Sequence, residues 1–169
     1  MTWTRNGYVI RLACAADAEA YFHALFDPLD PEAARLTGSQ ESYPKEVVIP
    51  FFLRCTADPA RHDFLILAPS GQIIGESVIN EYDPETNSAN YRIMIAGAHN
   101  RNNGIGTWAV QCACAFAFET LHLDRLTLGV FAFNPRARHV YEKCGFEPFG
   151  TEDNEVLMQL THQKWLTLR

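Results

Sequence analysis

The stretch "HNRNNGIGTWA", residues 99–109, decides the fold, because it joins a glycine-rich loop to the start of a helix. Apolar residues recur behind it at helical spacing, namely Ile105, Trp108, Ala109, Cys112 and Phe116. Gly104 and Gly106 let a ligand approach the backbone without an intervening Cβ, and Arg101 adds a positive charge. Free amides and the helix dipole favour anions, so the stretch predicts a phosphate- or pyrophosphate-binding loop before a helix over 104–120.

Two other nucleotide loops fit this stretch less well. "GIGTWA" matches the G-x-G-x-x-A fingerprint of dinucleotide-binding folds, but antiparallel strands precede it and the chain after it is too short for a second half. The next predicted strand, "RLTLGVFAF" (125–133), also ends without an acid that could hold a ribose hydroxyl. A P-loop is excluded because no Gly-Lys-Ser/Thr follows. A plain loop with a glycine turn remains the alternative to an anion site.

Hydrophobic patterning on either side of the loop predicts an α+β fold. Strands are predicted over 8–13, 63–69, 72–82, 89–96, 125–133, 146–150 and 155–160, and helices over 17–26, 45–55, 104–120, 134–146 and 162–166. Residues 27–59 are otherwise expected to be irregular. The early strands are joined by turns and the later ones by a helix, so we expect a mixed sheet, first antiparallel and then with a helical crossover.

A second stretch, "FNPRARHVYEKCGF" (133–146), carries helix signals and a tyrosine on the helix that they predict. Asn134 is an N-cap, Pro135 occupies the first helical position and Gly145 ends the helix. Asn134 and Tyr141 lie on one helical face by their spacing. If the strands before the two helices are parallel neighbours, both helix starts meet at one sheet edge, which places Tyr141 near the ligand of the first loop.

Composition excludes several classes of protein. The chain has 169 residues, the size of one domain, and a net charge of −6 without a basic run, which argues against nucleic-acid binding. It shows no apolar signal-peptide core and no run of eighteen apolar residues, so we expect a cytoplasmic protein without a membrane segment. Its five scattered cysteines are expected to be free thiols, and no metal site is predicted.

Together the two stretches resemble the signatures of the GNAT superfamily of acetyl-CoA-dependent N-acetyltransferases. Residues 101–106 match its R/Q-x-x-G-x-G/A motif, and residues 134–146 match N-x-x-A-x-x-x-Y-x-x-x-G-F. The region from 92 to 146 is also similar to the RimJ/RimL-like branch, whose members acetylate ribosomal-protein N-termini, polyamines or small amines. Asn102 and Asn103 depart from the family, which often has Gly and a basic residue there, so the loop is less basic than usual.

The resemblance implies a single GNAT domain whose mixed sheet contains a splayed strand pair and carries helices on both faces. It implies acetyl-CoA as co-substrate, with a primary amine attacking the thioester directly. The implied coenzyme A-binding residues are Met94, Ile95, Ala96, Arg101, Asn102, Asn103, Gly104, Ile105, Gly106, Thr107 and Asn134. An amide near Ile95 or Ala96 would meet the oxyanion, and Tyr141 would protonate the thiolate as general acid.

The general base is harder to assign. Glu76, in the strand "IIGESVINEY", is the candidate, because a strand carboxylate can face a cleft; the alternative is a solvated edge residue. Glu41 is a second candidate, and a chain of ordered water is a third route. His99 and His139 flank the two motifs and are expected to face solvent.

The acceptor site is expected under the segment 27–59. Its acids Asp27, Asp30, Glu32, Glu41 and Glu46 outnumber Arg35, Lys45 and Arg54, which favours a cationic amine. A peptide N-terminus, a polyamine, an aminoglycoside and an amino acid all remain open. Exposed edge strands are compatible with a homodimer. A non-catalytic acyl-CoA-binding sensor with the same fold is the alternative function.

Overall fold

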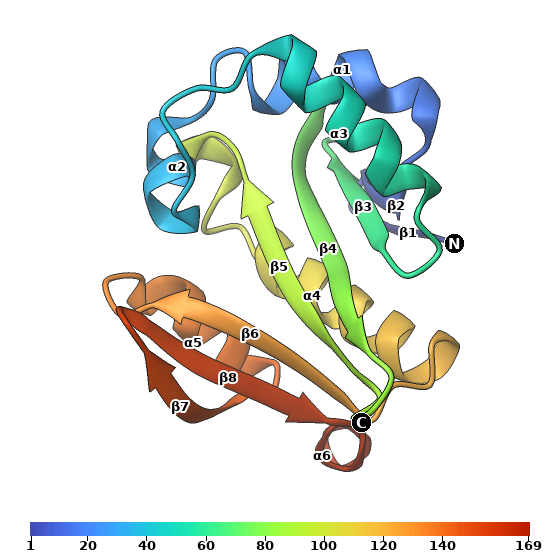
Figure 1. Ribbon diagram of the computed structural model, residues 1–169, viewed down its shortest axis with the longest axis vertical. Coiled ribbons are helices and arrows are strands. Elements are labelled where there is room, and N and C mark those ends of the chain that lie inside the picture. Colours follow the sequence, from blue (N-terminus) through green and yellow to red (C-terminus); the bar gives the residue numbers. More distant parts are fainter.

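The computed structural model describes all residues 1–169 and contains one eight-stranded sheet (Figure 1). The strands are β1 (Thr2–Arg5), β2 (Tyr8–Leu12), β3 (His62–Leu67), β4 (Ile73–Asp83), β5 (Ser88–Ile95), β6 (Arg125–Phe131), β7 (Glu147–Glu152) and β8 (Glu155–Thr161). Their order is β1-β2-β3-β4-β5-β6-β8-β7, and every neighbouring pair is antiparallel except β5 and β6. The predicted meander and crossover are therefore present; β1 was not predicted.

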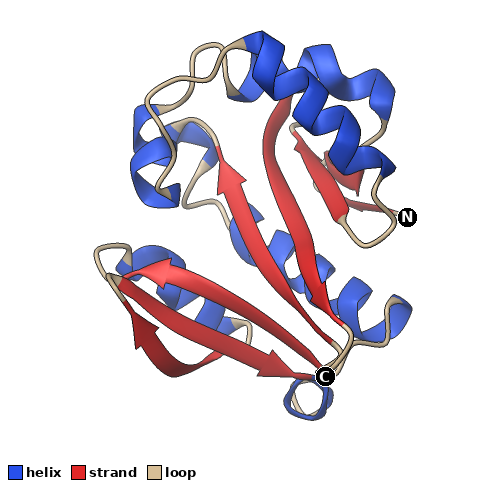
Figure 2. Ribbon diagram, viewed as in Figure 1, coloured by secondary structure: helices blue, strands red, loops and turns tan.

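The helices cover both faces of this sheet (Figure 2). They are α1 (Ala18–Leu25), α2 (Pro31–Thr37), α3 (Lys45–Ala57), α4 (Ile105–Ala115), α5 (Pro135–Lys143) and α6 (His162–Leu166), and a π-helical turn over Phe116–Thr120 extends α4. Short 3₁₀ turns precede α1 and α4 at Ala15–Asp17 and Ala98–Asn100. The predicted helices are confirmed, but α2 lies in the segment that we expected to be irregular.

Local signals explain why α2 forms. The Asp30 side chain accepts hydrogen bonds from the amides of Glu32 and Ala33, and Pro31 occupies the first turn. The helix ends at Gly38, whose φ of 67° is left-handed. The capping pattern was thus present in the sequence.

Two apolar clusters hold the helices to the sheet. The larger packs α4 and α5 on one face around residues such as Ala109, Leu126 and Met158, all fully buried. The smaller packs α1 and α3 on the other face around Leu25 and Phe52. The sheet is thus the middle layer of three over the β3–β5 region.

The parallel pair β5–β6 separates along its length (Figure 1). It is paired only where Ser88–Asn90 face Arg125–Thr127; beyond this point β6 pairs with β8 and the rest of β5 pairs with β4. The approach of β4 to β5 depends on Gly75, because a Cβ there would overlap the carbonyl oxygen of Met94. The divergence leaves the cleft-side edge of β5 without a strand partner.

Other features bear on the sequence predictions. No helix combines the length and apolar character needed to cross a bilayer. All five cysteines are free, and only Cys14 is exposed.

Candidate functional site

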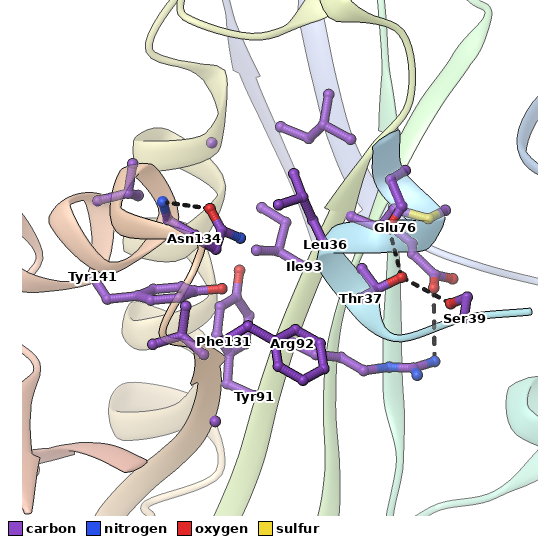
Figure 3. A pocket seen from close by; sticks show the side chains of 18 of the residues that line it. Leu36, Thr37, Ser39, Glu76, Tyr91, Arg92, Ile93, Phe131, Asn134 and Tyr141 are labelled. Atoms are coloured by element: carbon purple, nitrogen blue, oxygen red, sulfur yellow. Dashed lines mark hydrogen bonds and ion pairs between the residues drawn. The ribbon is translucent and has the colours of Figure 1, made fainter. Parts of the chain in front are cut away.

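A cavity of about 1000 Å³ opens where β5 and β6 separate. We call it the cleft. Residues from α1, α2, α3, β4, β5, β6, the N-terminus of α4 and α5 line it. Figure 3 shows Tyr141 and Asn134 entering from α5 on one side, and Glu76 and Arg92 on the other. The cleft therefore brings both predicted motifs and the predicted base to one place.

The free edge of β5 offers backbone groups to the cleft. The Ala96 N–H donates to the Ile74 carbonyl of β4 at 2.8 Å, and antiparallel pairing alternates. The amides of Ile93 and Ile95 therefore point away from β4, toward the cleft. Ile95, and not Ala96, has the amide that is free to meet an oxyanion.

The loop before α4 presents free amides at a helix N-terminus. Gly104 caps α4 with a φ of 81°, and open space lies where its Cβ would be. The side chain of Asn103 accepts from the Ile105 N–H at 3.1 Å, whereas the Gly106 and Thr107 amides have no partner in the chain. Asparagine at 102 replaces a family glycine without backbone conflict, because its φ of 60° is one that asparagine tolerates.

The Arg101 guanidinium is held by partners within the chain and is not free to bind an anion at the loop. Its Nη2 donates to Asp30 Oδ2 at 2.6 Å and its Nε donates to the Ile95 carbonyl at 3.1 Å. Asp30 Oδ2 also accepts from the Gly97 N–H at 2.6 Å. Both charged side chains are largely buried, so Arg101 braces the loop against α2 and the end of β5. We expected it to supply the loop's positive charge, but its charge is neutralised by Asp30.

Positive charge beside the loop comes instead from α5. Arg136, His139 and Lys143 line the cleft, and the Arg136 guanidinium donates to the Asn102 side chain at 3.4 Å. His139 is exposed, as predicted. Sequence reasoning missed Arg136 and Lys143, although the basic residues of "NPRARHVYEK" were a visible signal. The absence of a basic residue at positions 102 and 103 of the loop is therefore offset by the neighbouring helix.

Tyr141 lies at the centre of the cleft wall. It is 6% exposed and its ring meets that of Tyr91 edge-on, with centroids 6.5 Å apart. Its hydroxyl makes no hydrogen bond within the chain, yet it is not among enclosed polar atoms without a partner, so it faces the cavity. Burial raises the pKa of Tyr141, which keeps its proton available for donation at neutral pH.

Asn134 both caps α5 and lines the cleft. Its side-chain oxygen accepts from the Ala137 N–H at 3.2 Å, which is the predicted N-cap of α5. The residue is 9% exposed and lines the cleft, so its amide nitrogen is left for a ligand.

Glu76 is buried in a central strand and is not a solvated edge residue. Its Oε2 accepts from the Tyr21 hydroxyl at 2.6 Å, and its Oε1 lies 3.6 Å from the Arg92 guanidinium. Burial and the neighbouring Glu76 charge raise the pKa of Tyr21, so this phenol stays a donor. The carboxylate is thus held in place on the side of the cleft opposite Tyr141.

The segment 27–59 forms the wall over the cleft, but its acids lie elsewhere. Asp30 pairs with Arg101, Glu32 pairs with Arg35, and Glu41 is exposed. The wall residues are Leu29, Ala33, Leu36, Thr37, Ser39, Tyr43, Val47, Val48, Phe51 and Arg54. The acids of this segment, which we expected to favour a cationic acceptor, do not line the cleft, and the only charged residue that the segment places there is Arg54.

Comparisons with known proteins agree with this architecture. Residues 8–147 match the acetyltransferase (GNAT) domain family. The curated spermidine N(1)-acetyltransferase of Vibrio cholerae serotype O1 is 32% identical over 89 residues, which are 53% of this chain and 51% of that protein. The matched part thus spans about half the length of this relative.

Solved structures show the same fold. Spermidine N-acetyltransferase from Vibrio cholerae in complex with CoA and spermine has 20% identity and a TM-score of 0.81, over 96% of this chain and 99% of that chain. A dodecameric structure of that enzyme in an intermediate state has 19% identity and a TM-score of 0.75, over 97% and 99% of the two chains. The predicted fold class is confirmed.

Proposed function

The chain belongs to the acetyltransferase (GNAT) family, and from this premise we propose that it transfers the acetyl group of acetyl-CoA to a primary amine. When bound, acetyl-CoA would supply an activated acetyl group, whose carbonyl carbon a neutral amine attacks with displacement of the coenzyme A thiolate. The observation that carries the proposal is the cleft between β5 and β6, which has Tyr141 on one side and Glu76 on the other.

The residues of the cleft fit coenzyme A. The free amides of Gly106 and Thr107 bind its pyrophosphate, and Arg136 adds the positive charge. The free edge of β5 at Ile93 and Ile95 accepts the pantetheine arm as an additional strand. Of the predicted set, Met94 and Ala96 turn their amides toward β4 and shape this edge, and Asn103 positions Ile105.

Two side chains move the protons of the reaction. Glu76 accepts a proton from the incoming ammonium group, either directly or through water. The Ile95 amide stabilises charge on the thioester oxygen. The Tyr141 hydroxyl, which has no other partner, donates its proton to the departing thiolate and regains one from the nitrogen as the amide forms.

Calorimetric titration with acetyl-CoA tests the binding half of the proposal. A Gly104→Asp variant places a carboxylate in the anion site, and we expect its affinity to fall at least about 100-fold. Gly71→Asp is the matched control, because Gly71 also has a positive φ (85°) and open space at its Cβ, but lies in the β3–β4 turn. Absence of acetyl-CoA binding by the parent protein would refute the proposed function.

Release of coenzyme A over a panel of amines tests catalysis. Tyr141→Phe removes only the hydroxyl, so we expect kcat to fall about 100-fold or more while acetyl-CoA affinity stays within about twofold. Binding of acetyl-CoA without turnover of any amine would instead support the sensor alternative.

The remaining assignments are proposals as well. We propose a small amine as acceptor, since the similar proteins are named spermidine acetyltransferases, and a cytoplasmic location. We also propose self-association, because the similar spermidine N-acetyltransferase from Vibrio cholerae has a dodecameric structure and because the outer strand β7 is exposed along its whole length. Membership of the RimJ/RimL-like branch stays a prediction.

A further inference from the structure

We infer that Arg92 binds a carboxylate of the acceptor, so that the acceptor is an amino acid with an apolar side chain and not a polyamine. This inference rests on the proposed acetyl transfer and specifies its substrate. It follows from the charges and apolar surfaces that the cleft presents around Glu76.

Arg92 is a guanidinium with unused donors in the cleft wall. It stands on β5 opposite Val78, and its side chain is 49% exposed. Its single charged partner is Glu76, at 3.6 Å, which is too long for the close fork-to-carboxylate geometry of a strong Arg–carboxylate pair. Figure 3 shows the side chain extending along the cleft, joined to Glu76 by one contact. Most of its donors are therefore available to a ligand.

Arg92 is the only charged side chain of the cleft that forms an ion pair with Glu76. Glu81 is five residues along β4 from Glu76, about 16 Å at the rise of a strand. Glu155 lies on β8, against Gly129 of β6 and across the opening. Arg54 is the one charge from the wall segment. An acceptor whose amine meets Glu76 thus has the Arg92 cation directly beside it.

This arrangement complements a zwitterion. In an α-amino acid the ammonium nitrogen and a carboxylate oxygen are about 3 Å apart. Glu76 and Arg92 present the opposite charges at a similar spacing, 3.6 Å. A polyamine offers Arg92 only a second cation, which like-charge repulsion disfavours.

The wall accommodates an apolar side chain. Leu36, Tyr43 and Phe51 of the wall segment and Phe131 of β6 line the cleft, and Phe51 is 43% exposed. Phe131 packs closely against the end of α2, because a Cβ at Gly38 would lie only 3.0 Å from its ring. Apolar and aromatic surface of this kind contributes binding energy by burial.

Matched amines that differ only in a carboxylate test the inference. Initial rates of coenzyme A release are measured with L-phenylalanine against phenethylamine, L-leucine against isopentylamine, and spermidine. We expect kcat/KM to be at least about tenfold higher for each amino acid than for its decarboxylated partner, and lowest for spermidine.

Arg92→Gln identifies the residue responsible. We expect KM for the amino acids to rise about 10- to 100-fold, with phenethylamine within about twofold of the parent. Arg138→Gln is the control, because Arg138 pairs with Glu142 of the same helix and does not line the cleft. Acetyl-CoA affinity is measured for each variant to verify the fold.

The outcomes separate this inference from the proposed function. If the protein binds acetyl-CoA, three results overturn the inference. These are a preference for spermidine, equal rates for the matched amines, and no turnover of any amine. An unchanged preference in Arg92→Gln also overturns it. Failure to bind acetyl-CoA refutes the proposed function itself.

Discussion

Replacing Asp30 tests whether one carboxylate joins α2, the end of β5 and the loop before α4. Its Oδ1 caps α2 by accepting from the Glu32 and Ala33 amides at 2.9 and 3.3 Å. Its Oδ2 accepts from Gly97 and from Arg101, both at 2.6 Å. Asp30→Ala removes all four interactions without adding bulk.

The expected loss of stability follows from two effects. Losing the N-cap costs about 1 kcal/mol. Leaving the Arg101 guanidinium unpaired, with its side chain only 11% exposed, costs about 3 kcal/mol. We therefore expect Asp30→Ala to lower the free energy of unfolding by about 4 kcal/mol. Asp30→Asn keeps a good N-cap residue, so its loss should be smaller by about 1 kcal/mol.

Urea denaturation of both variants at neutral pH measures these differences. Asp58→Ala is the control, because Asp58 is exposed and accepts a single backbone bond, from Ala60 at 2.9 Å. It should change the free energy of unfolding by less than about 1 kcal/mol. An equally small change for Asp30→Ala would refute the reasoning.

The pH dependence supplies a second test of the same contact. Burial acts to raise the pKa of Asp30, but the hydrogen bonds from Gly97 and Ala33 and the charge of Arg101 outweigh it and lower the pKa. A lowered folded-state pKa stabilises the fold above the ordinary carboxyl value of about 4, and this is lost as the pH falls through the folded-state pKa. The difference in the free energy of unfolding between the parent protein and Asp30→Ala should therefore become smaller below a pH of about 4.

Three further changes probe the sheet, the base and the thiols. Gly75→Ala should lower the free energy of unfolding by more than about 2 kcal/mol, because the added Cβ meets a backbone oxygen of β5. Gly150→Ala, whose added Cβ has its nearest contact at 3.8 Å, should change this free energy by less than about 1 kcal/mol. Denaturant melts compare the two variants. Tyr21→Phe removes the donor to Glu76 and should lower kcat/KM about tenfold while acetyl-CoA affinity stays unchanged. An unchanged kcat/KM would show that the Tyr21 hydroxyl does not assist Glu76 as the base. A thiol reagent at pH 8 should modify Cys14 alone until the protein is unfolded, since the other four thiols are buried and burial raises the pKa of two of them to about 11; rapid reaction of a second thiol would contradict this.

Local patterns explain how much of the fold could be predicted. Helix caps, glycine stops and alternating apolar residues act over a few positions, so the strands and most helices were predicted close to their observed bounds. Helix α2 was missed although its cap, proline and terminal glycine were all present, because the surrounding prolines suggested an irregular segment. β1 is short and largely exposed, so it lacks a clear hydrophobic pattern.

The features of the cleft are likewise of two kinds: some follow from short motifs, and others depend on contacts between residues far apart in the sequence. The glycine loop, the N-cap at Asn134 and the position of Tyr141 depend on short motifs, and the sequence by itself determined them together with the family. The tertiary structure alone decided that Arg101 pairs with Asp30, 71 positions away, and that Tyr21 holds Glu76 across 55 positions. Such contacts require β4, β5 and the helices above them to meet in space. A charge is neutralised or left free according to what packs against it, and sequence spacing carries no record of that packing.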